Sequence, residues 1–436
     1  MADNLKVKVH GTQPALSNLG DFFLSHPHLQ EHVRHLHVIV PLWETMLGQP
    51  MPHGNSADRD REGSVFNQFI HGQLSTQRII IDHQSEHSNI FRPATKRATL
   101  AEIFASAQVL LPGLHALTIE SANCKHPPQI TYFRHTSRGL VPSQPSRPGT
   151  RMPSPVGPAL PALPSVKTLI LAGAWSIIRN PRELELISNA IPNLNDISCS
   201  YHTLKTSPYI TMCNALHPRR LPQAIRHVNL CLEGSFSKVM NSLDKWKKVY
   251  PEHHICRTLG DAMPQLESLS YTGRLCGSLF SEAIRAAQDK RFDHIRTKRI
   301  DIIVKNVCRD TRSMNDATGI QSWLFMQTFE TLIIQAMRAL ALYPQIAFLR
   351  VRYIDLDSPD QPLNPFFQYE HNEAWGFWSE QIVELFYAAR PKARFIPPMI
   401  EGESMYVERK PGTKQSIPID RYRVLSAYLA GRPHGF

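Results

Sequence analysis

Histidines are the residues of this chain whose types and spacing most resemble a site of chemistry. The sequence has 21 of them, and five lie within residues 26–37. His28, His32 and His35 have an i, i+4, i+7 spacing, which on a helix would form one face able to bind a transition metal. A strand over VRHLHVIV (33–40) would instead turn His35 away from the other two. We favour the strand, and so we expect no metal site here.

Other signatures of catalysis are missing. The sequence has no GxSxG, GxxxxGK[ST] or HExxH motif, and no GxGxxG follows a predicted strand. Its 7 cysteines are widely spaced without a CxxC pair, which favours neither a disulfide framework nor a zinc ribbon. We therefore expect a non-catalytic protein without a cofactor. The alternative is an enzyme whose site is assembled from residues far apart in sequence.

The net charge of +11 suggests a nucleic-acid or acidic partner. The basic residues are spread out, however, and the densest stretch, residues 291–312, also contains Asp293, Asp301 and Asp310. We interpret that stretch as a solvated face and regard nucleic-acid binding as an alternative that the sequence disfavours.

The apolar content of the chain and its distribution bear on cellular location. The chain of 436 residues is 42% apolar, which is enough for a core. Its first residues lack the apolar run of a signal peptide, and the most apolar window, residues 323–349, is interrupted by charges and a proline. We expect that window to be a buried helix. We expect no membrane association, and a cytoplasmic or nuclear protein.

A recurring short pattern indicates the elements that position these residues. In each copy a proline is followed by apolar residues two, five and seven positions later. Most of these prolines are preceded by apolar residues at helical spacing and followed by alternating ones. Because proline cannot continue a helix, each unit is predicted to be a helix, a stop and a short strand. Full copies occur at Pro112, Pro164, Pro192, Pro264 and Pro344, a slipped copy at Pro222, and a copy without proline at Val33.

Two further copies are expected in the long gaps between these. One would have its helix at residues 278–290 and its strand at 299–304, and the other would have a strand near 78–81. One helix and one strand cannot bury their apolar faces alone, whereas stacked copies can. We therefore predict an α/β fold with parallel strands joined by helical crossovers, namely an irregular solenoid with strands on the concave face and helices on the convex face. A closed barrel would need more even spacing.

Composition divides the chain further. Residues 1–137 would form the N-terminal part of the array, and residues 164–355 its main part. Between them, residues 138–163 are rich in Pro, Ser and Gly and are predicted to be a flexible insertion. Residues 356–436 would hold one amphipathic helix, at 372–390, and a Pro-rich tail.

The repeating unit resembles a long, helix-containing leucine-rich repeat, LxxLxLxxN/C, although the asparagine position is not kept. The opening LGDFFLSHPHLQEHVRHLHVIVPLWE is similar to a segment of filamentous-fungal F-box proteins, as is PIDRYR near the other end. The resemblance implies a substrate receptor of a cullin–RING ubiquitin ligase, in which the repeats bind the target. An F-box that would bind the ligase adaptor is not visible before the first repeat, so adaptor binding is expected only if one lies upstream.

We thus expect a protein-binding scaffold that uses the polar side chains of its strands. The apolar residues of each strand should face the helices, so the residues between them should line the concave sheet face. That surface would suit a mixed-charge protein partner better than a phosphate backbone. The predicted surface comprises His35, His37, Thr118, Glu120, Asp196, Ser198, His227, Asn229, Ser268, Ser270, Asp301, Arg350 and Arg352.

Overall fold

The structure is a computed structural model of the 436-residue chain. It divides into two compact units, the first unit (Met1–Leu194) and the second unit (Asn195–Phe436), which are described separately below. The predicted insertion at 138–163 lies almost wholly outside the described residues. The structure describes residues 5–11, 13–40, 77–80, 100–121, 160–173, 181–200, 206–232, 249, 252–289, 294–307, 323–353, 365–396, 404–410 and 413–418.

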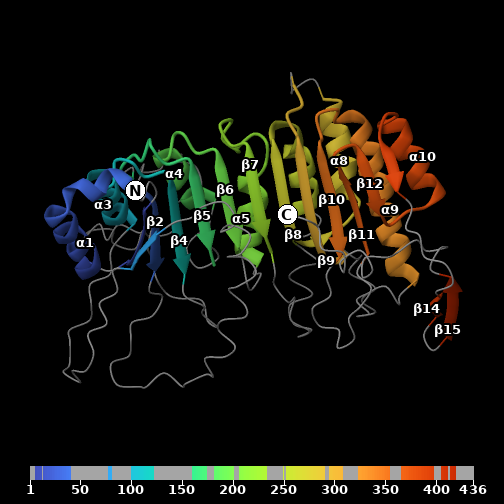
Figure 1. The fold of residues 1–436 in the computed structure, drawn as a ribbon, viewed down its shortest axis with the longest axis horizontal. Helices are drawn as coiled ribbons and strands as arrows, with labels where there is room; N and C mark the ends of the chain where they lie inside the picture. The colour runs from blue at the N-terminus through green and yellow to red at the C-terminus, as the bar shows by residue number, and fades with distance from the viewer. Residues whose placement is uncertain are drawn as a thin grey trace, which may run out of the picture. The chain divides into compact units, whose positions relative to one another are not determined.

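The first unit contains a parallel sheet with strand order β5-β4-β2-β1-β3. Its helices lie on one face of these strands (Figure 1). Its elements are β1 (Leu5–His10), α1 (Gln13–Ser25), the 3-10 helix η1 (Pro27–His32), β2 (Val33–Val40), β3 (Gln77–Ile80), α3 (Leu100–Leu110), β4 (Ala116–Ser121), β5 (Thr168–Ala172) and α4 (Pro181–Ala190).

The second unit contains strands in the order β6-β7-β8-β9-β10-β11-β12-β13. Strands β7 to β10 pair in parallel with their predecessors, whereas β11 and β12 are antiparallel additions. Strands β14 and β15 form a separate antiparallel pair. The elements are β6 (Asp196–Ser200), α5 (Thr206–Ala215), β7 (His227–Cys231), α7 (Ile255–Ala262), the 3-10 helix η4 (Met263–Gln265), β8 (Ser268–Leu275), α8 (Ser278–Ala287), β9 (Arg299–Val307), α9 (Trp323–Leu342), β10 (Phe348–Tyr353), β11 (Phe366–Glu370), β12 (Glu373–Gly376), α10 (Glu380–Ala389), β13 (Arg394–Ile396), β14 (Ser404–Lys410) and β15 (Thr413–Pro418).

The predicted unit of helix, stop and strand is confirmed in the described repeats. Helices α3, α4, α7 and α9 each end just before the proline of their copy, and α5 ends before Pro222. The copy expected in the long gap is present as α8 and β9. A strand, β3, is present near residues 78–81 as expected, but its expected place as a repeat copy is wrong, because β3 pairs with β1 at the sheet edge and β2 pairs directly with β4. The helix–strand boundary near Val33 is also correct, since η1 ends at His32 and β2 begins at Val33.

Backbone hydrogen bonds align the starts of successive strands in the second unit. The amide of each residue just before a strand donates to the carbonyl at the same place in the preceding repeat. Arg226 thus donates to Asn195 (2.8 Å), Glu267 to Arg226 (2.7 Å), Lys298 to Glu267 (2.9 Å) and Ala347 to Lys298 (2.9 Å). This ladder sets the register, so equivalent residues of neighbouring repeats lie side by side.

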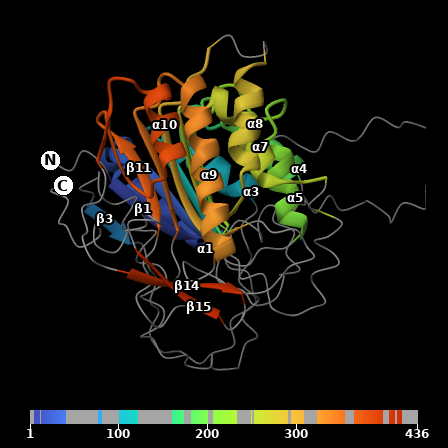
Figure 2. The same cartoon turned by 90° about the vertical axis from the view of Figure 1, so that its right-hand side faces the viewer.

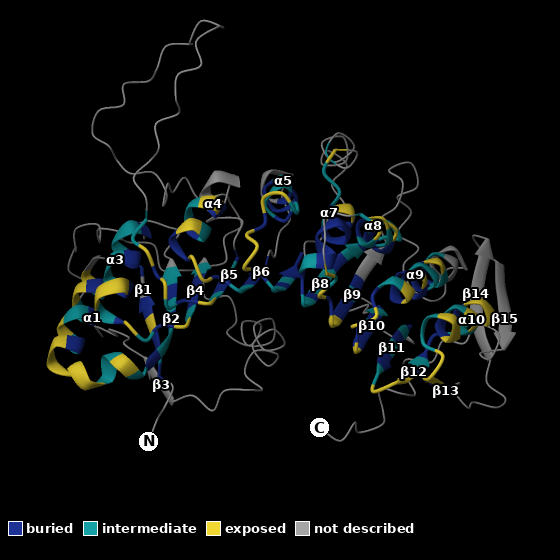
Figure 3. Cartoon of the chain, turned by 90° about the horizontal axis from the view of Figure 1, so that it is seen from above, coloured by how far each residue is buried: buried dark blue, intermediate teal, exposed yellow. Residues whose placement is uncertain are grey.

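The core of each unit lies between the sheet and its helices. In β8, Leu269, Tyr271 and Leu275 are buried and alternate with less buried polar residues (Figure 3). Helices α7, α8, α9 and α10 pack side by side (Figure 2). The buried helix predicted within residues 323–349 is present as α9, whose Phe329 and Leu332 are buried. Among the described helices, none combines the length and hydropathy needed to span a membrane.

Two parts of the fold differ from the sequence-based expectation. Strand β1 was not predicted, although its LKVKVH alternation has a strand period, and it lies between β2 and β3. The segment expected as one helix at 372–390 is strand β12 followed by α10. His371 and Asn372 have φ of 51° and 62°, the left-handed geometry of a two-residue hairpin turn, which adds β11 and β12 to the sheet. The region after residue 356 therefore holds several strands besides its helix.

Candidate functional site

The face of the second unit that its helices leave uncovered carries the predicted polar residues. No described helix of this unit lies on that side of β6 to β10 (Figure 3). We call the side chains of β6–β10 that project to this side the open face. The pairing register places one such row straight across the strands. That row comprises Ser198, Asn229, Ser270, Asp301 and Arg350.

An ion pair lies at the β9–β10 end of this row. Arg350 donates two hydrogen bonds to Asp301, from Nε to Oδ1 (2.9 Å) and from Nη2 to Oδ2 (2.5 Å). The Asp301 side chain is 8% exposed and that of Arg350 is 19% exposed. The expectation of a solvated face over residues 291–312 is therefore wrong at Asp301, because its cross-strand neighbours cover it.

Arg299 completes a cluster around the same carboxylate. Its Nη2 is 3.6 Å from Asp301 Oδ2, and its guanidinium carbon is 3.7 Å from the centre of the Phe348 ring. The guanidinium carbon of Arg350 is 5.4 Å from that ring. Phe348 pairs directly with Arg299 in the sheet, so register explains the stacking.

Arg352 carries a buried donor on the open face that is unsatisfied among the described residues. It lies two residues beyond Arg350 on β10, beside Ile303 and Phe366 on the flanking strands. Its Nε is buried and has no hydrogen-bond partner among the described residues. Burial lowers the pKa of the Arg352 guanidinium; Arg350 lowers it further, and Asp301 raises it. We call Arg299, Arg350 and Arg352 the arginine cluster. Among the described residues, Asp301 is the carboxylate that pairs with this cluster, and it cannot balance all of the positive charge.

The β6–β8 side of the open face is polar with small side chains. Asn229 and Ser270 are half-buried, and the Oγ of Ser198 is buried without a hydrogen-bond partner among the described residues. In the neighbouring row, His227 Nε2 lies 3.8 Å from Asp196 Oδ1. These groups can exchange hydrogen bonds with a polar surface at low conformational cost.

The first unit has its own polar strand face. His35 Nε2 hydrogen-bonds Thr118 Oγ1 (2.7 Å), and His37 Nε2 hydrogen-bonds Glu120 Oε2 (2.6 Å). The hydrogen bond from His37 is the main reason that the pKa of Glu120 lies below its usual value. Burial of Glu120 opposes this shift, and nearby lysines reinforce it.

This depressed pKa predicts an acid-dependent loss of stability. A carboxylate whose folded pKa is below its unfolded value of 4.5 stabilises the fold above pH 4.5, and that contribution disappears as pH falls through the folded pKa. We expect Glu120→Gln to lose this dependence, so that its unfolding midpoint falls less than that of the wild type as pH drops below ~4.5. Urea unfolding at a series of pH values measures this. Identical acid limbs for the two proteins would contradict it.

The structure places every predicted surface residue on a strand. These residues are divided among the two units, however. His35, His37, Thr118 and Glu120 belong to the first unit, and the others to the second, so each unit is treated as carrying its own surface. Thr118, Ser198 and Asp301 are more buried than expected, because neighbouring side chains cover them.

Sequence reasoning missed several residues on these faces. Arg299 and Phe348 begin their strands at positions that we had not assigned to the surface. Lys6 and Lys8 pair with His35 and His37 through the unpredicted strand β1. Extending each strand by one alternating position would have found Arg299 and Phe348, and the Lys-Val-Lys-Val alternation would have found the two lysines.

Comparisons with known proteins add no family to this description. No family model, curated protein or solved structure matches the chain. Its function is therefore inferred from the geometry of its own residues.

Proposed function

We propose that the open face of the second unit binds a partner protein, and that a carboxylate of this partner pairs with Arg352 and Arg350. The proposed role is binding without catalysis. The resemblance of the repeats to those of F-box receptors suggests a target of ubiquitylation as the partner.

The observation that carries the proposal is the buried Nε of Arg352, which has no hydrogen-bond partner among the described residues. A buried donor without an acceptor destabilises a folded protein, and a guanidinium that is desolvated beside another arginine does so further. Asp301 does not supply this acceptor: its oxygens accept the two hydrogen bonds from Arg350, and Arg352 Nε has no partner among the described residues. A carboxylate from outside would supply the missing acceptor and the missing negative charge.

The surroundings of Arg352 suit a protein surface. Arginine and aromatic side chains are enriched among residues that dominate binding energy at interfaces, and here Phe366 lies beside Arg352. The small polar residues of β6–β8 extend the same face with donors and acceptors. Away from the arginine cluster, the β6–β8 side of the face carries Asp196, which would repel a phosphate backbone and disfavours nucleic acid as the partner.

A peptide selection tests the proposal while the partner protein is still unidentified. Random peptides displayed on phage are selected on the purified full-length protein, and the affinities of the enriched peptides are measured by fluorescence anisotropy. We expect a shared Asp or Glu in these peptides and at least a ~10-fold weaker affinity for Arg352→Leu, since an unpaired charge-assisted contact costs about 2 kcal/mol.

A matched control separates this site from general charge attraction. Arg338 lies exposed on α9, on the helical side of the unit, so Arg338→Leu makes the same chemical change away from the open face. Its affinity for the peptides should equal that of the wild type. Equal weakening by both substitutions, or enrichment of peptides without acidic residues, would overturn the proposal. Salt-sensitive binding of RNA that Arg352→Leu abolishes would instead assign this face to nucleic acid.

A further inference from the structure

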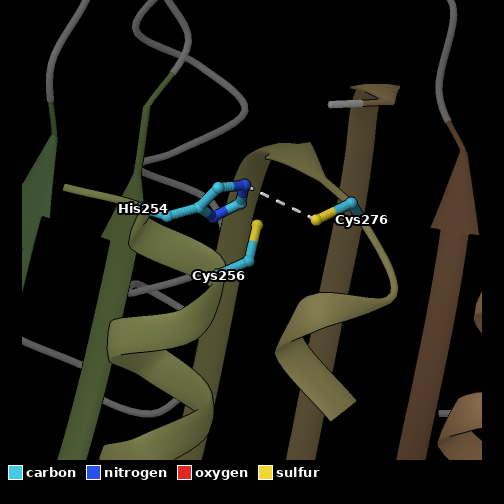
Figure 4. A group of neighbouring side chains, drawn as sticks. All are labelled: His254, Cys256 and Cys276. Carbon is cyan, nitrogen blue, oxygen red and sulfur yellow. Dashed lines mark hydrogen bonds between the residues drawn. The ribbon is translucent and has the colours of Figure 1, made fainter. Parts of the chain in front are cut away.

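Three side chains able to bind a metal ion meet where β8 passes into α8. His254 precedes α7, Cys256 lies in the first turn of α7, and Cys276 follows the last residue of β8. One ligand atom from each lies within 4.8 Å of the other two. Figure 4 shows the imidazole and both thiols gathered in the same space. None of these residues belongs to the open face.

We propose that His254, Cys256 and Cys276 bind one Zn²⁺ ion and leave its fourth coordination position open. The Nε2 of His254 and the Sγ of Cys276 are 3.7 Å apart. A tetrahedral zinc with bonds of about 2.3 Å to sulfur and about 2.0 Å to nitrogen would separate these atoms by about 3.5 Å. The cluster thus needs only small side-chain rotations to surround a metal.

The ligand types select the class of metal. Two thiolates and an imidazole favour zinc over magnesium or calcium, which prefer oxygen ligands. Cys256 lies in the first turn of α7, and Cys276 immediately precedes Gly277, the residue that caps α8. Both sulfurs therefore lie near helix N-termini, whose partial positive charge stabilises a thiolate. Sites with three protein ligands commonly hold water or a substrate at the fourth position.

Neighbouring hydrogen bonds hold the ligand-bearing backbone in place. The Tyr271 hydroxyl donates to the carbonyl of Arg274 (2.8 Å), two residues before Cys276. The amide of Ile255, between His254 and Cys256, donates to the Tyr209 hydroxyl (3.0 Å). The thiol of Cys256 also points to the Arg274 carbonyl (3.8 Å), and zinc would replace the proton of that contact.

Cys199, another thiol of this unit, can serve as a control for the zinc site. Burial raises the pKa of Cys199 to about 12, which disfavours its thiolate. Cys199 therefore offers no competing site, and Cys199→Ala should leave zinc binding unchanged. A disulfide between Cys256 and Cys276 would compete with zinc binding, because it would remove both sulfur ligands.

The test uses the full-length chain, reduced and stripped of metal with a chelator. Zn²⁺ affinity is measured by competition with a chromogenic chelator, and Co²⁺ is used as a spectroscopic probe. We expect one high-affinity Zn²⁺ per chain and a thiolate-to-cobalt charge-transfer band. His254→Ala and Cys276→Ser should each weaken binding by more than the ~100-fold that loss of an outer-shell partner can cause.

Folding controls distinguish the loss of a zinc ligand from the loss of the folded structure. The metal-free variants should melt at the same temperature as the metal-free wild type, and Zn²⁺ should raise the melting temperature of the wild type but not of Cys276→Ser. If a variant does not fold, the cobalt spectrum of the wild type alone decides, because it reports thiolate ligation directly. Retention of Zn²⁺ by Cys276→Ser, absence of the charge-transfer band, or a Cys256–Cys276 disulfide that persists under reducing conditions would overturn the proposal. None of these outcomes affects the role proposed for Arg352.

Discussion

Replacing Gly260 by alanine is expected to destabilise the second unit by about 3 kcal/mol, the upper part of the range for overpacked cores. Gly260 lies in α7 where this helix crosses α8. A Cβ atom at this position would approach the carbonyl oxygen of Leu279 in α8, and would lie 3.0 Å from the amide nitrogen of Ala283. Both are backbone atoms, so the clash cannot be relieved by turning a side chain, and the two helices would have to separate.

Whether Gly260→Ala raises or lowers stability depends on two opposing effects, helix propensity and the steric clash. In an exposed helix, alanine is more favourable than glycine by about 1 kcal/mol. At Gly260 the clash is expected to exceed that gain. At Gly20 in α1 a Cβ would meet nothing within 4 Å, so Gly20→Ala should raise stability by ~0.5–1 kcal/mol. Urea unfolding followed by circular dichroism measures both. A Gly260→Ala protein as stable as the wild type would contradict the close packing of α7 on α8.

Arg350 and Arg352 are expected to affect stability in opposite directions, although they lie on the same strand. Arg350→Met should destabilise the protein by about 3 kcal/mol, because it leaves the buried carboxylate of Asp301 without its bidentate partner. Arg299, at 3.6 Å, compensates only in part. Adding Asp301→Asn to this variant should recover most of the loss, since the uncompensated charge is then gone.

Arg352→Met should instead stabilise the protein by ~1 kcal/mol, because it removes a buried donor that has no acceptor among the described residues. A residue that lowers the stability of the fold is typical of a binding site. Thermal unfolding of the two variants under one condition measures the difference. If Arg352→Met destabilised the protein as much as Arg350→Met, Arg352 would be a structural residue and its assignment to binding would fail.

The repeating units were predictable because their signals are local. Proline at a fixed distance before an apolar alternation stops the helix and starts the strand within a few residues, as at Pro264 and Pro344. The open-face residues then follow from the period of two along each strand. The hairpin of β11 and β12 was not found, because its turn residues, His371 and Asn372, lie in a segment whose aromatic residues also fit a helical period.

The sites depend on register between distant strands, which one sequence does not reveal. Asp301 and Arg350 were both assigned to the surface, but nothing local to either residue indicates that they meet in a bidentate pair. Likewise, Cys276 is far in sequence from His254 and Cys256, and their spacing fits no familiar metal motif. Only the return of the chain from α7 through β8 brings these residues together.

A charge exchange across the proposed interface tests the central claim most directly. Arg352→Glu should weaken binding of the selected acidic peptide by ~30-fold or more, which corresponds to about 2 kcal/mol. Replacing the acidic residue of the peptide by arginine should restore most of the affinity for Arg352→Glu and abolish it for the wild type. If the exchanged pair binds no better than either single change, Arg352 does not contact the partner's carboxylate, and the proposed binding role of the open face is contradicted.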